Sequence, residues 1–201
     1  MTALTHLFFD IGGVLGTNGW DSEQRSAAAD RFGLDAEFDA RHREVVGDWE
    51  LGRLSADEYL DLVVFYEPRP FTRDEFFAWM QAQSRPFPET IALAQRVAAA
   101  GRVRMFTLNN ESAELNQVRI DRFGLAGIFD AFLSSCWLGT RKPLRRIFEV
   151  AVSVVQASAG ASLLIDDREQ NLAAARAAGM RTILYRDAAS LEEALRHEGL
   201  L

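Results

Sequence analysis

The chain has 201 residues and a formal net charge of −7, with 48% hydrophobic and 25% charged residues. This composition is typical of a soluble globular protein with one full domain, or with a core and a small inserted domain. Nucleic acids and anionic membranes bind basic surfaces, so we expect neither as a partner of this acidic chain. No apolar run approaches the roughly 18 residues of a membrane span and no basic segment precedes a long apolar stretch, so we expect a cytoplasmic protein.

The first predicted element is an apolar run over 7–15 that contains one carboxylate, Asp10, followed by the glycine pair Gly12 and Gly13. Buried strands are apolar runs of this kind, and paired glycines end them. The pattern therefore predicts a carboxylate at the end of a buried strand, where open α/β sheets place their ligands. Taken alone, Asp10 fits a turn-capping residue equally well.

Residues 17–88 carry no convincing strand pattern and instead contain several amphipathic stretches. Ser55 and Thr72 are each followed three residues later by glutamate, which is the spacing of a capping box at a helix start. We predict an all-helical segment with helices over 22–32, 37–49, 56–66 and 73–83. Because it follows the first strand directly, this segment is expected to lie over the end of that strand, next to Asp10.

From residue 89 onward, apolar runs alternate with amphipathic stretches, most of which are followed by glycine, the residue that commonly ends helices. This regular alternation predicts parallel βαβ units and a doubly wound α/β sheet. We assign residues 1–16 and 89–201 to the α/β core and 17–88 to a helical cap. The predicted strands lie over 103–108, 128–133, 161–165 and 181–185, and the predicted helices over 89–100, 112–122, 143–156, 171–178 and 190–197.

Polar residues follow the predicted strands at several points, and the carboxyl ends of parallel strands meet at one edge of a sheet. Asp10, Lys142 and the pair Asp166–Asp167 are therefore expected to converge. Three carboxylates in one pocket repel one another unless cations hold them ionised, and an oxygen-ligated hard cation such as Mg²⁺ fits such a site. Each feature also has a simpler interpretation, with Lys142 as a solvated loop residue and the aspartates as helix caps.

Four ordered segments, over 8–15, 106–110, 139–143 and 163–171, resemble the motifs of the haloacid dehalogenase-like hydrolases. Within that superfamily the chain is most similar to the subgroup that includes the amino-terminal phosphatase domain of soluble epoxide hydrolase. The helical segment fits the resemblance, because this family carries a helical cap after its first strand. The resemblance implies a Rossmann-like core and a Mg²⁺-dependent phosphatase that hydrolyses a small phosphorylated metabolite.

The resemblance also implies residue roles. Asp10 would be the nucleophile that forms an aspartyl-phosphate, and Lys142 would balance its charge. Asp10, the backbone carbonyl of Gly12, and Asp167 would bind the metal, with Asp166 in the same shell. The phosphoryl oxygens would be held by Lys142, Gly12 and polar groups of the second motif, which are Asn109, Asn110 and, with less support, Thr107.

Two positions depart from the family pattern. The usual first motif is Asp-x-Asp, whose second carboxylate protonates the leaving oxygen and later activates water, and here Gly12 takes that place. Losing such a group typically costs about 10²–10⁴ in rate. In the second motif, Leu108 stands where the family usually has Ser or Thr, and Thr107 lies one residue too early.

These departures leave two alternative functions open. A haloacid dehalogenase uses a similar aspartate without a metal, although the pair Asp166–Asp167 argues against a metal-free site. The third possibility is a catalytically weak relative that binds a phosphorylated ligand or a protein.

Overall fold

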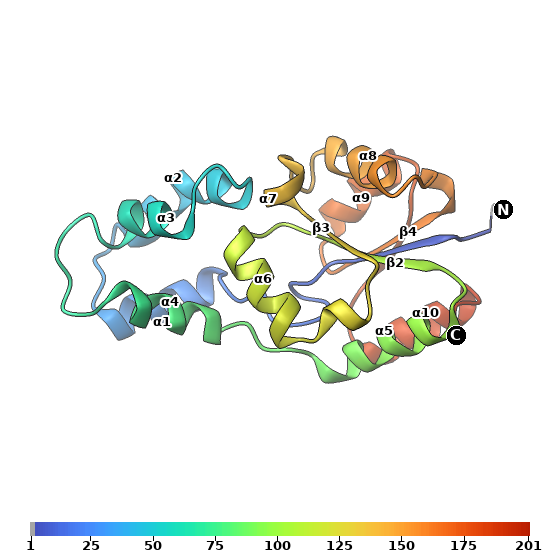
Figure 1. Cartoon of the computed structure of the whole chain (residues 1–201), viewed down its shortest axis with the longest axis horizontal. Helices are drawn as coiled ribbons and strands as arrows, with labels where there is room; N and C mark the ends of the chain where they lie inside the picture. Colours follow the sequence, from blue (N-terminus) through green and yellow to red (C-terminus); the bar gives the residue numbers. More distant parts are fainter. Residues whose placement is uncertain (1–2) are drawn as a thin grey trace.

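The computed structural model describes residues 3–201, and its core is a single sheet of five parallel strands in the order β3-β2-β1-β4-β5 (Figure 1). The doubly wound parallel sheet predicted from the sequence is therefore confirmed. The central strand has neighbours on both sides, so residues at its carboxyl end lie next to the ends of two other strands. The strands are β1 (His6–Phe9), β2 (Arg104–Asn109), β3 (Ala131–Ser134), β4 (Ser162–Asp166) and β5 (Arg181–Leu184).

Apolar side chains on both faces of β1 explain why it lies in the middle of the sheet. Leu7, Phe8 and Phe9 are completely buried, and Phe8 pairs with Phe106 of β2 and Leu164 of β4. The helices α5 (Pro88–Ala100) and α10 (Ala188–His197) cover one face, whereas α8 (Arg145–Val154) and α9 (Glu169–Ala177) cover the other (Figure 1). The sheet is thus buried on both sides, as parallel sheets are.

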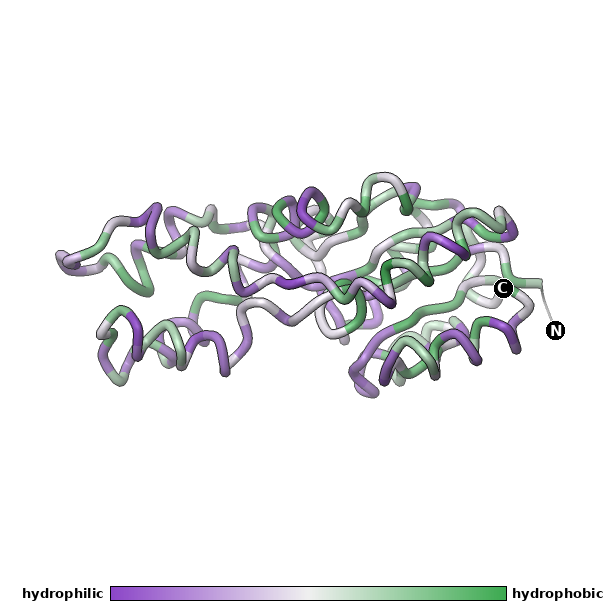
Figure 2. Tube along the Cα trace, turned by 90° about the horizontal axis from the view of Figure 1, so that it is seen from below, coloured by the Kyte–Doolittle hydropathy of each residue, from purple (hydrophilic) through white to green (hydrophobic). Residues whose placement is uncertain are grey.

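Four helices follow β1 and form a separate group beyond the sheet, on the side away from both termini (Figure 1). They are α1 (Ser22–Phe32), α2 (Phe38–Glu50), α3 (Ala56–Val63) and α4 (Arg73–Ala82). This group has its own aromatic core, which includes Trp20, Phe38, Trp49, Tyr59 and Phe76. Figure 2 shows the helices alternating between hydrophilic and hydrophobic colour along the chain, as expected of helices with one buried face. The predicted helical cap is therefore present.

Local signals explain most of the helix boundaries. The capping boxes predicted at Ser55 and Thr72 are both formed, and Asp21 forms a third one, which the sequence analysis did not predict. The helix predicted over 56–66 ends earlier, at Val63. A further short helix, α7 (Ser135–Leu138), lies between the strand predicted over 128–133 and the helix predicted over 143–156, where no helix was predicted. One helical turn is too short to show the 3.6-residue periodicity on which such predictions rest.

Hydrogen bonds join the cap to the core on more than one side. The chain enters and leaves the cap through segments bonded to each other: the Thr17 hydroxyl donates to the Gln83 carbonyl (2.6 Å), and the Thr17 amide donates to the Arg85 carbonyl (2.9 Å). On the other side, the Ser135 hydroxyl of α7 donates to the Glu50 carbonyl of α2 (2.6 Å). These contacts hold the cap over the carboxyl edge of the sheet.

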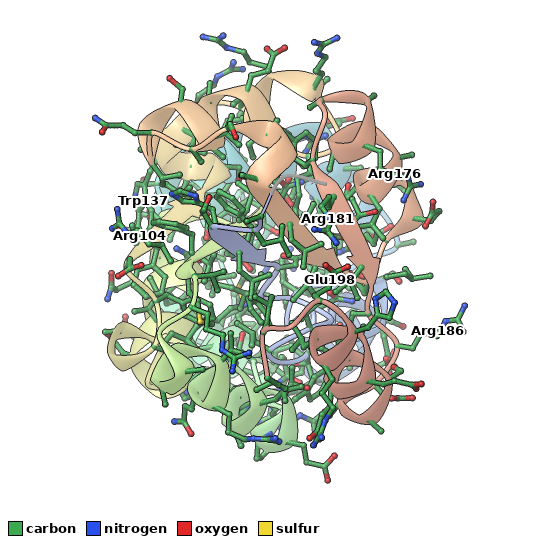
Figure 3. The ribbon with its side chains drawn as sticks, turned by 90° about the vertical axis from the view of Figure 1, so that its right-hand side faces the viewer. Arg104, Trp137, Arg176, Arg181, Arg186 and Glu198 are labelled. Carbon is green, nitrogen blue, oxygen red and sulfur yellow. The ribbon has the colours of Figure 1, made fainter. Side chains whose placement is uncertain are left out.

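Figure 3 looks onto the end of the molecule opposite the cap, where Arg181 of β5 lies beside Glu198, with which it forms an ion pair. In the described part of the chain, no helix is long and apolar enough to cross a membrane.

Candidate active site

Three carboxylates converge at the carboxyl edge of the sheet. Asp10 follows β1, Asp166 ends β4, and Asp167 comes next. One carboxylate oxygen from each lies within 4.8 Å of the others. The convergence follows from the register, because Phe9 pairs with Ile165 and the next residue of each strand is an aspartate. This spacing is compatible with three ligands of one cation.

Lys142 lies between two of these carboxylates. Its ammonium nitrogen is 2.8 Å from Asp10 Oδ2 and 2.6 Å from Asp166 Oδ2, and its side chain is 1% exposed. A buried lysine is retained only when its charge is paired. The simpler interpretation of Lys142 as a solvated loop residue is therefore wrong.

Burial and charge alter the proton affinities of these groups. Burial raises the pKa of Asp10 to about 7, while Lys142 acts in the opposite direction. Burial together with the neighbouring Asp166 raises the pKa of Asp167. Burial alone would lower the pKa of Lys142, but Asp10 and Asp166 hold it above its ordinary value. The carboxylates outnumber the lysine, so a further positive charge would favour their ionised forms.

The two acidic residues after β4 differ in their hydrogen bonds. Asp166 is fully engaged, because it binds Lys142 and also accepts hydrogen bonds from the Arg168 amide (2.9 Å) and the Asn171 side chain (3.0 and 3.1 Å). Asp167, in contrast, has a buried Oδ1 with no hydrogen-bond partner in the described part of the chain. Leaving a buried carboxylate oxygen without a partner costs free energy. Oδ1 of Asp167 is therefore the oxygen of this cluster that a bound cation would stabilise most.

Gly13 makes room for Asp167. Its φ of +76° lies in the left-handed region, and a Cβ at this position would come within 2.2 Å of Asp167 Oδ2. Only glycine combines this backbone conformation with such a close approach. The second glycine of the first motif therefore shapes the carboxylate cluster directly.

The polar side chains of the second motif lie in different places. Asn110 clamps the main chain of Lys142: its side-chain nitrogen donates to the Lys142 carbonyl, and its oxygen accepts from the Lys142 amide, both at 2.8 Å. Asn109 points elsewhere and donates to Asn116 of α6 (Ala113–Arg122), and Thr107 is completely buried without a partner for its hydroxyl among residues 3–201.

A cavity of about 280 Å³ opens between Asp10 and the cap. Asp10, Gly12, Asn110 and Lys142 line its core side, whereas Asp166 and Asp167 do not line it. Asn109 and Thr107 do not contribute to it. The cap side is lined by residues of the first loop and of α1 and α2, which are Asn18, Trp20, Asp21, Arg25, His42, Val46, Trp49 and Glu50. A larger and more open cavity of about 850 Å³ shares Asn18 and Asp21 with it but contains none of the three clustered aspartates.

Sequence reasoning missed one buried ion pair in this cavity. Arg119 of α6 is 2% exposed, and its Nη2 lies 2.8 Å from Glu111 Oε2. Burial raises the pKa of Glu111, although Arg119 acts to lower it. The sequence feature that could have revealed this ion pair is an arginine on the buried face of α6, one position before Ile120 and four after Leu115. A charged residue at such a position is unusual unless it is paired.

Sequence and structure comparisons place the chain in a family. The sequence profile of the haloacid dehalogenase-like hydrolases matches residues 4–179. The chain belongs to the haloacid dehalogenase-like hydrolases. The superfamily predicted from the four motifs is thereby confirmed, whereas the narrower likeness to the phosphatase domain of soluble epoxide hydrolase stays a prediction.

Solved structures share the fold of this hydrolase. A haloacid dehalogenase family enzyme from Bacteroides thetaiotaomicron, in complex with magnesium and inorganic phosphate, superposes with a TM-score of 0.81 at 17% identity, covering 94% of this chain and 99% of that one. A predicted family hydrolase from Porphyromonas gingivalis gives a TM-score of 0.79 at 20% identity, covering 97% and 99%. An L-2-haloacid dehalogenase gives 0.65 at 15% identity, covering 96% and 100%.

One characterised relative matches part of the hydrolase sequence. The drimenol cyclase DrtB of Aspergillus calidoustus is 25% identical over 147 residues, which is 72% of this chain and 28% of that protein. The chain thus corresponds to little more than a quarter of this relative.

Proposed function

We propose that this hydrolase is a Mg²⁺-dependent phosphatase that transfers a phosphoryl group from a small phosphorylated metabolite to Asp10. The observation that carries the proposal is the cluster of the buried Asp10 and Asp166, both paired with Lys142, and the half-buried Asp167. Three carboxylates gathered beside one lysine favour a metal-assisted reaction of an anionic substrate. A metal-free dehalogenase would have no use for the unpaired oxygen of Asp167.

The residues present fit a magnesium ion. Asp10, Asp167 and the Gly12 carbonyl would hold it, and Asp166 would support it from the same cluster. Carboxylate and carbonyl oxygens are the ligands that Mg²⁺ prefers, and the unpartnered Oδ1 of Asp167 is such an oxygen. When bound, the ion supplies charge that orients and neutralises the phosphoryl oxygens.

The side chains at the site would have distinct roles in this reaction. Asp10 Oδ2 is held by Lys142, while Asp10 Oδ1 accepts a hydrogen bond from the Ile11 amide (2.8 Å), so the carboxylate has a defined orientation. Such an oriented carboxylate can attack phosphorus and form an aspartyl-phosphate. Lys142, fixed by Asn110, would stabilise the transferred phosphoryl group, and Asn110 itself faces the cavity. Asn109 and Thr107 remain sequence predictions for phosphate contacts.

Residues 17–88 would act as the cap that selects the substrate and excludes water. Asn18, Trp20 and His42 face the cavity from this segment. A phosphorylated small molecule fits a cavity of about 280 Å³ with polar walls. A catalytically weak relative is the alternative function, because Gly12 supplies no carboxylic acid at the usual position.

The test is phosphate release from p-nitrophenyl phosphate with and without Mg²⁺. We expect activity that requires Mg²⁺, disappears with chelator and is lost in Asp10→Asn, because that substitution removes the nucleophile. Gln117→Ala, an exposed position on α6, is the matched control and should retain activity. Activity that survives chelation or Asp10→Asn would contradict the proposal, and inactivity over a metabolite panel would favour a binding protein.

A further inference from the structure

The space beside Gly12 is occupied by Arg119. A Cβ at Gly12 would lie 3.0 Å from Asn18 Oδ1 and 3.2 Å from Arg119 Nη1, both tighter than ordinary contact. The φ of Gly12 is not among the positive values found in this chain, so its backbone does not require glycine. A guanidinium group and an amide thus fill the region into which a second carboxylate of the first motif would project.

Two polar contacts hold Arg119 in this place. Its Nη2 binds Glu111 and also donates to the Asn18 carbonyl (2.5 Å). Gly19 leaves room for it, because a Cβ there would lie 2.5 Å from Nη2. Both of these contacts use Nη2, while Nε is buried with no partner in the described part of the chain. Nη1 is the nitrogen nearest Gly12, and Arg119 lines the cavity.

A guanidinium at this position has a different chemistry from a carboxylic acid. Arginine stays protonated in proteins and therefore does not deliver a proton to a leaving group. It does stabilise negative charge that develops on an oxygen, and a buried guanidinium does so strongly. Glu111 is its anchor, because Oε2 binds Arg119 and Oε1 accepts from the Ser112 amide (3.0 Å).

We propose that Arg119 stabilises the departing oxygen without protonating it, so that the enzyme acts on substrates whose leaving group departs as a weakly basic anion, such as acyl phosphates and phosphoanhydrides. The inference rests on the proposed function, because it assumes phosphoryl transfer to Asp10. Carboxylates and phosphates have conjugate acids with pKa values of about 4 and 6, so they leave without a proton. An alkoxide is far more basic and needs an acid to depart.

The proposed steps balance without a general acid. An Asp10 carboxylate oxygen bonds to phosphorus while the bond to the leaving oxygen breaks, and its electron pair stays on that oxygen. Water then attacks the phosphorus of the aspartyl-phosphate, and the bond to Asp10 breaks with its electrons returning to the carboxylate. The products are the leaving-group anion, ionised Asp10, and dihydrogen phosphate, which keeps both protons of the water.

The first test compares leaving groups in the presence of Mg²⁺. We expect acetyl phosphate or inorganic diphosphate to be hydrolysed efficiently and butyl phosphate at least about a thousandfold more slowly in kcat/KM. The variant Arg119→Gln/Glu111→Gln replaces the ion pair by two neutral amides, which avoids leaving a buried charge unpaired. It should lower kcat/KM for the favoured substrate by about 10²–10³. Arg122→Gln, on the same helix outside the cavity, is the control.

Two results would overturn the inference while leaving the phosphatase intact. One is hydrolysis of butyl phosphate within about tenfold of acetyl phosphate, with Glu111→Gln slowing the butyl ester selectively, because Glu111 would then be the proton donor. The other is equal loss on all substrates in the double variant, including butyl phosphate, which would indicate a structural role only.

A binding measurement decides the inference even if turnover is absent. In Asp10→Asn protein with Mg²⁺, calorimetry should show inorganic diphosphate binding about tenfold more tightly than orthophosphate, because Arg119 adds a contact to the second phosphate. The preference should vanish when the Arg119→Gln/Glu111→Gln pair is added. A preference that persists without Arg119, or that is absent with it, would contradict the inference. Lack of Mg²⁺-dependent hydrolysis by the wild-type protein would count against the proposed function alone.

Discussion

At the scale of single residues, the adjacent glycines of the first motif serve different purposes. Gly13 combines a φ of +76° with an approach to Asp167 that no side chain would permit, so it is a requirement of the carboxylate cluster. Gly12 lies beside Arg119, and its missing side chain alters the chemistry rather than the backbone. The two positions therefore predict different mutant behaviour.

Gly13→Ala is expected to weaken Mg²⁺ binding. Its Cβ would come within 2.2 Å of Asp167 and displace the carboxylate, and the left-handed backbone adds a strain of about 1–3 kcal/mol. Gly33→Ala is the matched control, because its φ is +62° and a Cβ there meets nothing within 4 Å. Calorimetric Mg²⁺ titration and thermal unfolding of both variants separate the effects. Equal Mg²⁺ affinities in the two would contradict this account of Gly13.

Gly12→Asp is expected not to produce an efficient acid. The new carboxylate would lie against Arg119 Nη1, and an arginine partner favours the ionised form of a carboxylate. Turnover of butyl phosphate should therefore rise by less than about tenfold, which corresponds to about 1.4 kcal/mol of barrier. Steady-state rates at neutral pH measure this, and a larger rise would show that Arg119 tolerates an acid beside it.

At the scale of elements, the ends of β1, β2 and β4 bring the site together, and the loop after α7 contributes Lys142. This loop is positioned by Asn110, whose side chain forms two hydrogen bonds with the Lys142 main chain. In the proposed mechanism, the second motif would therefore act through the position of Lys142 as well as through the cavity surface.

Asn110→Ala is expected to lower kcat about 10²-fold, because a displacement of a charged group by about 1 Å has effects of that size. Gln117→Ala is the control, since it removes only an exposed hydrogen bond to Asp121 on α6. Steady-state kinetics should show a defect for Asn110→Ala that Gln117→Ala does not share. Similar kcat values for the two variants would contradict the clamp.

Much of this element-level arrangement could be predicted from sequence. Glycine caps, capping boxes and apolar runs predicted the strands and most helices. The position of the aspartates at the ends of parallel strands predicted that they converge. The orientation of β2 side chains was less accessible, because the sequence does not show that Asn109 turns toward Asn116 while Asn110 reaches Lys142. The pair Glu111–Arg119 was missed because its meaning depends on which face of α6 meets the cavity.

At the scale of the whole molecule, the candidate active-site cavity lies between core and cap, and both parts supply its walls. The buried His42 of α2 belongs to the cap wall, where its Nδ1 lies 2.8 Å from the Tyr59 hydroxyl. Burial and the nearby Arg25 lower the pKa of His42 to about 4. His42 is therefore uncharged at neutral pH and becomes protonated in the folded cap only in acid.

This histidine predicts an acid sensitivity of the fold. Its pKa in the folded state is below the ordinary value of 6.5, so the unfolded chain binds more protons between pH 6.5 and pH 4. The free energy of unfolding therefore includes a contribution from uncharged His42 that is fully present above pH 6.5. This contribution, up to about 3 kcal/mol, is lost as the pH falls toward 4. Urea unfolding at several pH values should show a steeper loss for the wild type than for His42→Gln, which retains a polar partner for Tyr59. Identical pH dependence would contradict the prediction.

The central claim is that Asp10 carries the phosphoryl group, and the most direct measurement is acid-quenched labelling with ³²P-acetyl phosphate in the presence of Mg²⁺. Without a carboxylate beside Gly12 to activate water, the aspartyl-phosphate should decay slowly enough to accumulate. The account predicts Mg²⁺-dependent label on the peptide containing Asp10, and none in Asp10→Asn. Turnover without label on that peptide, or label that persists in Asp10→Asn, would contradict it.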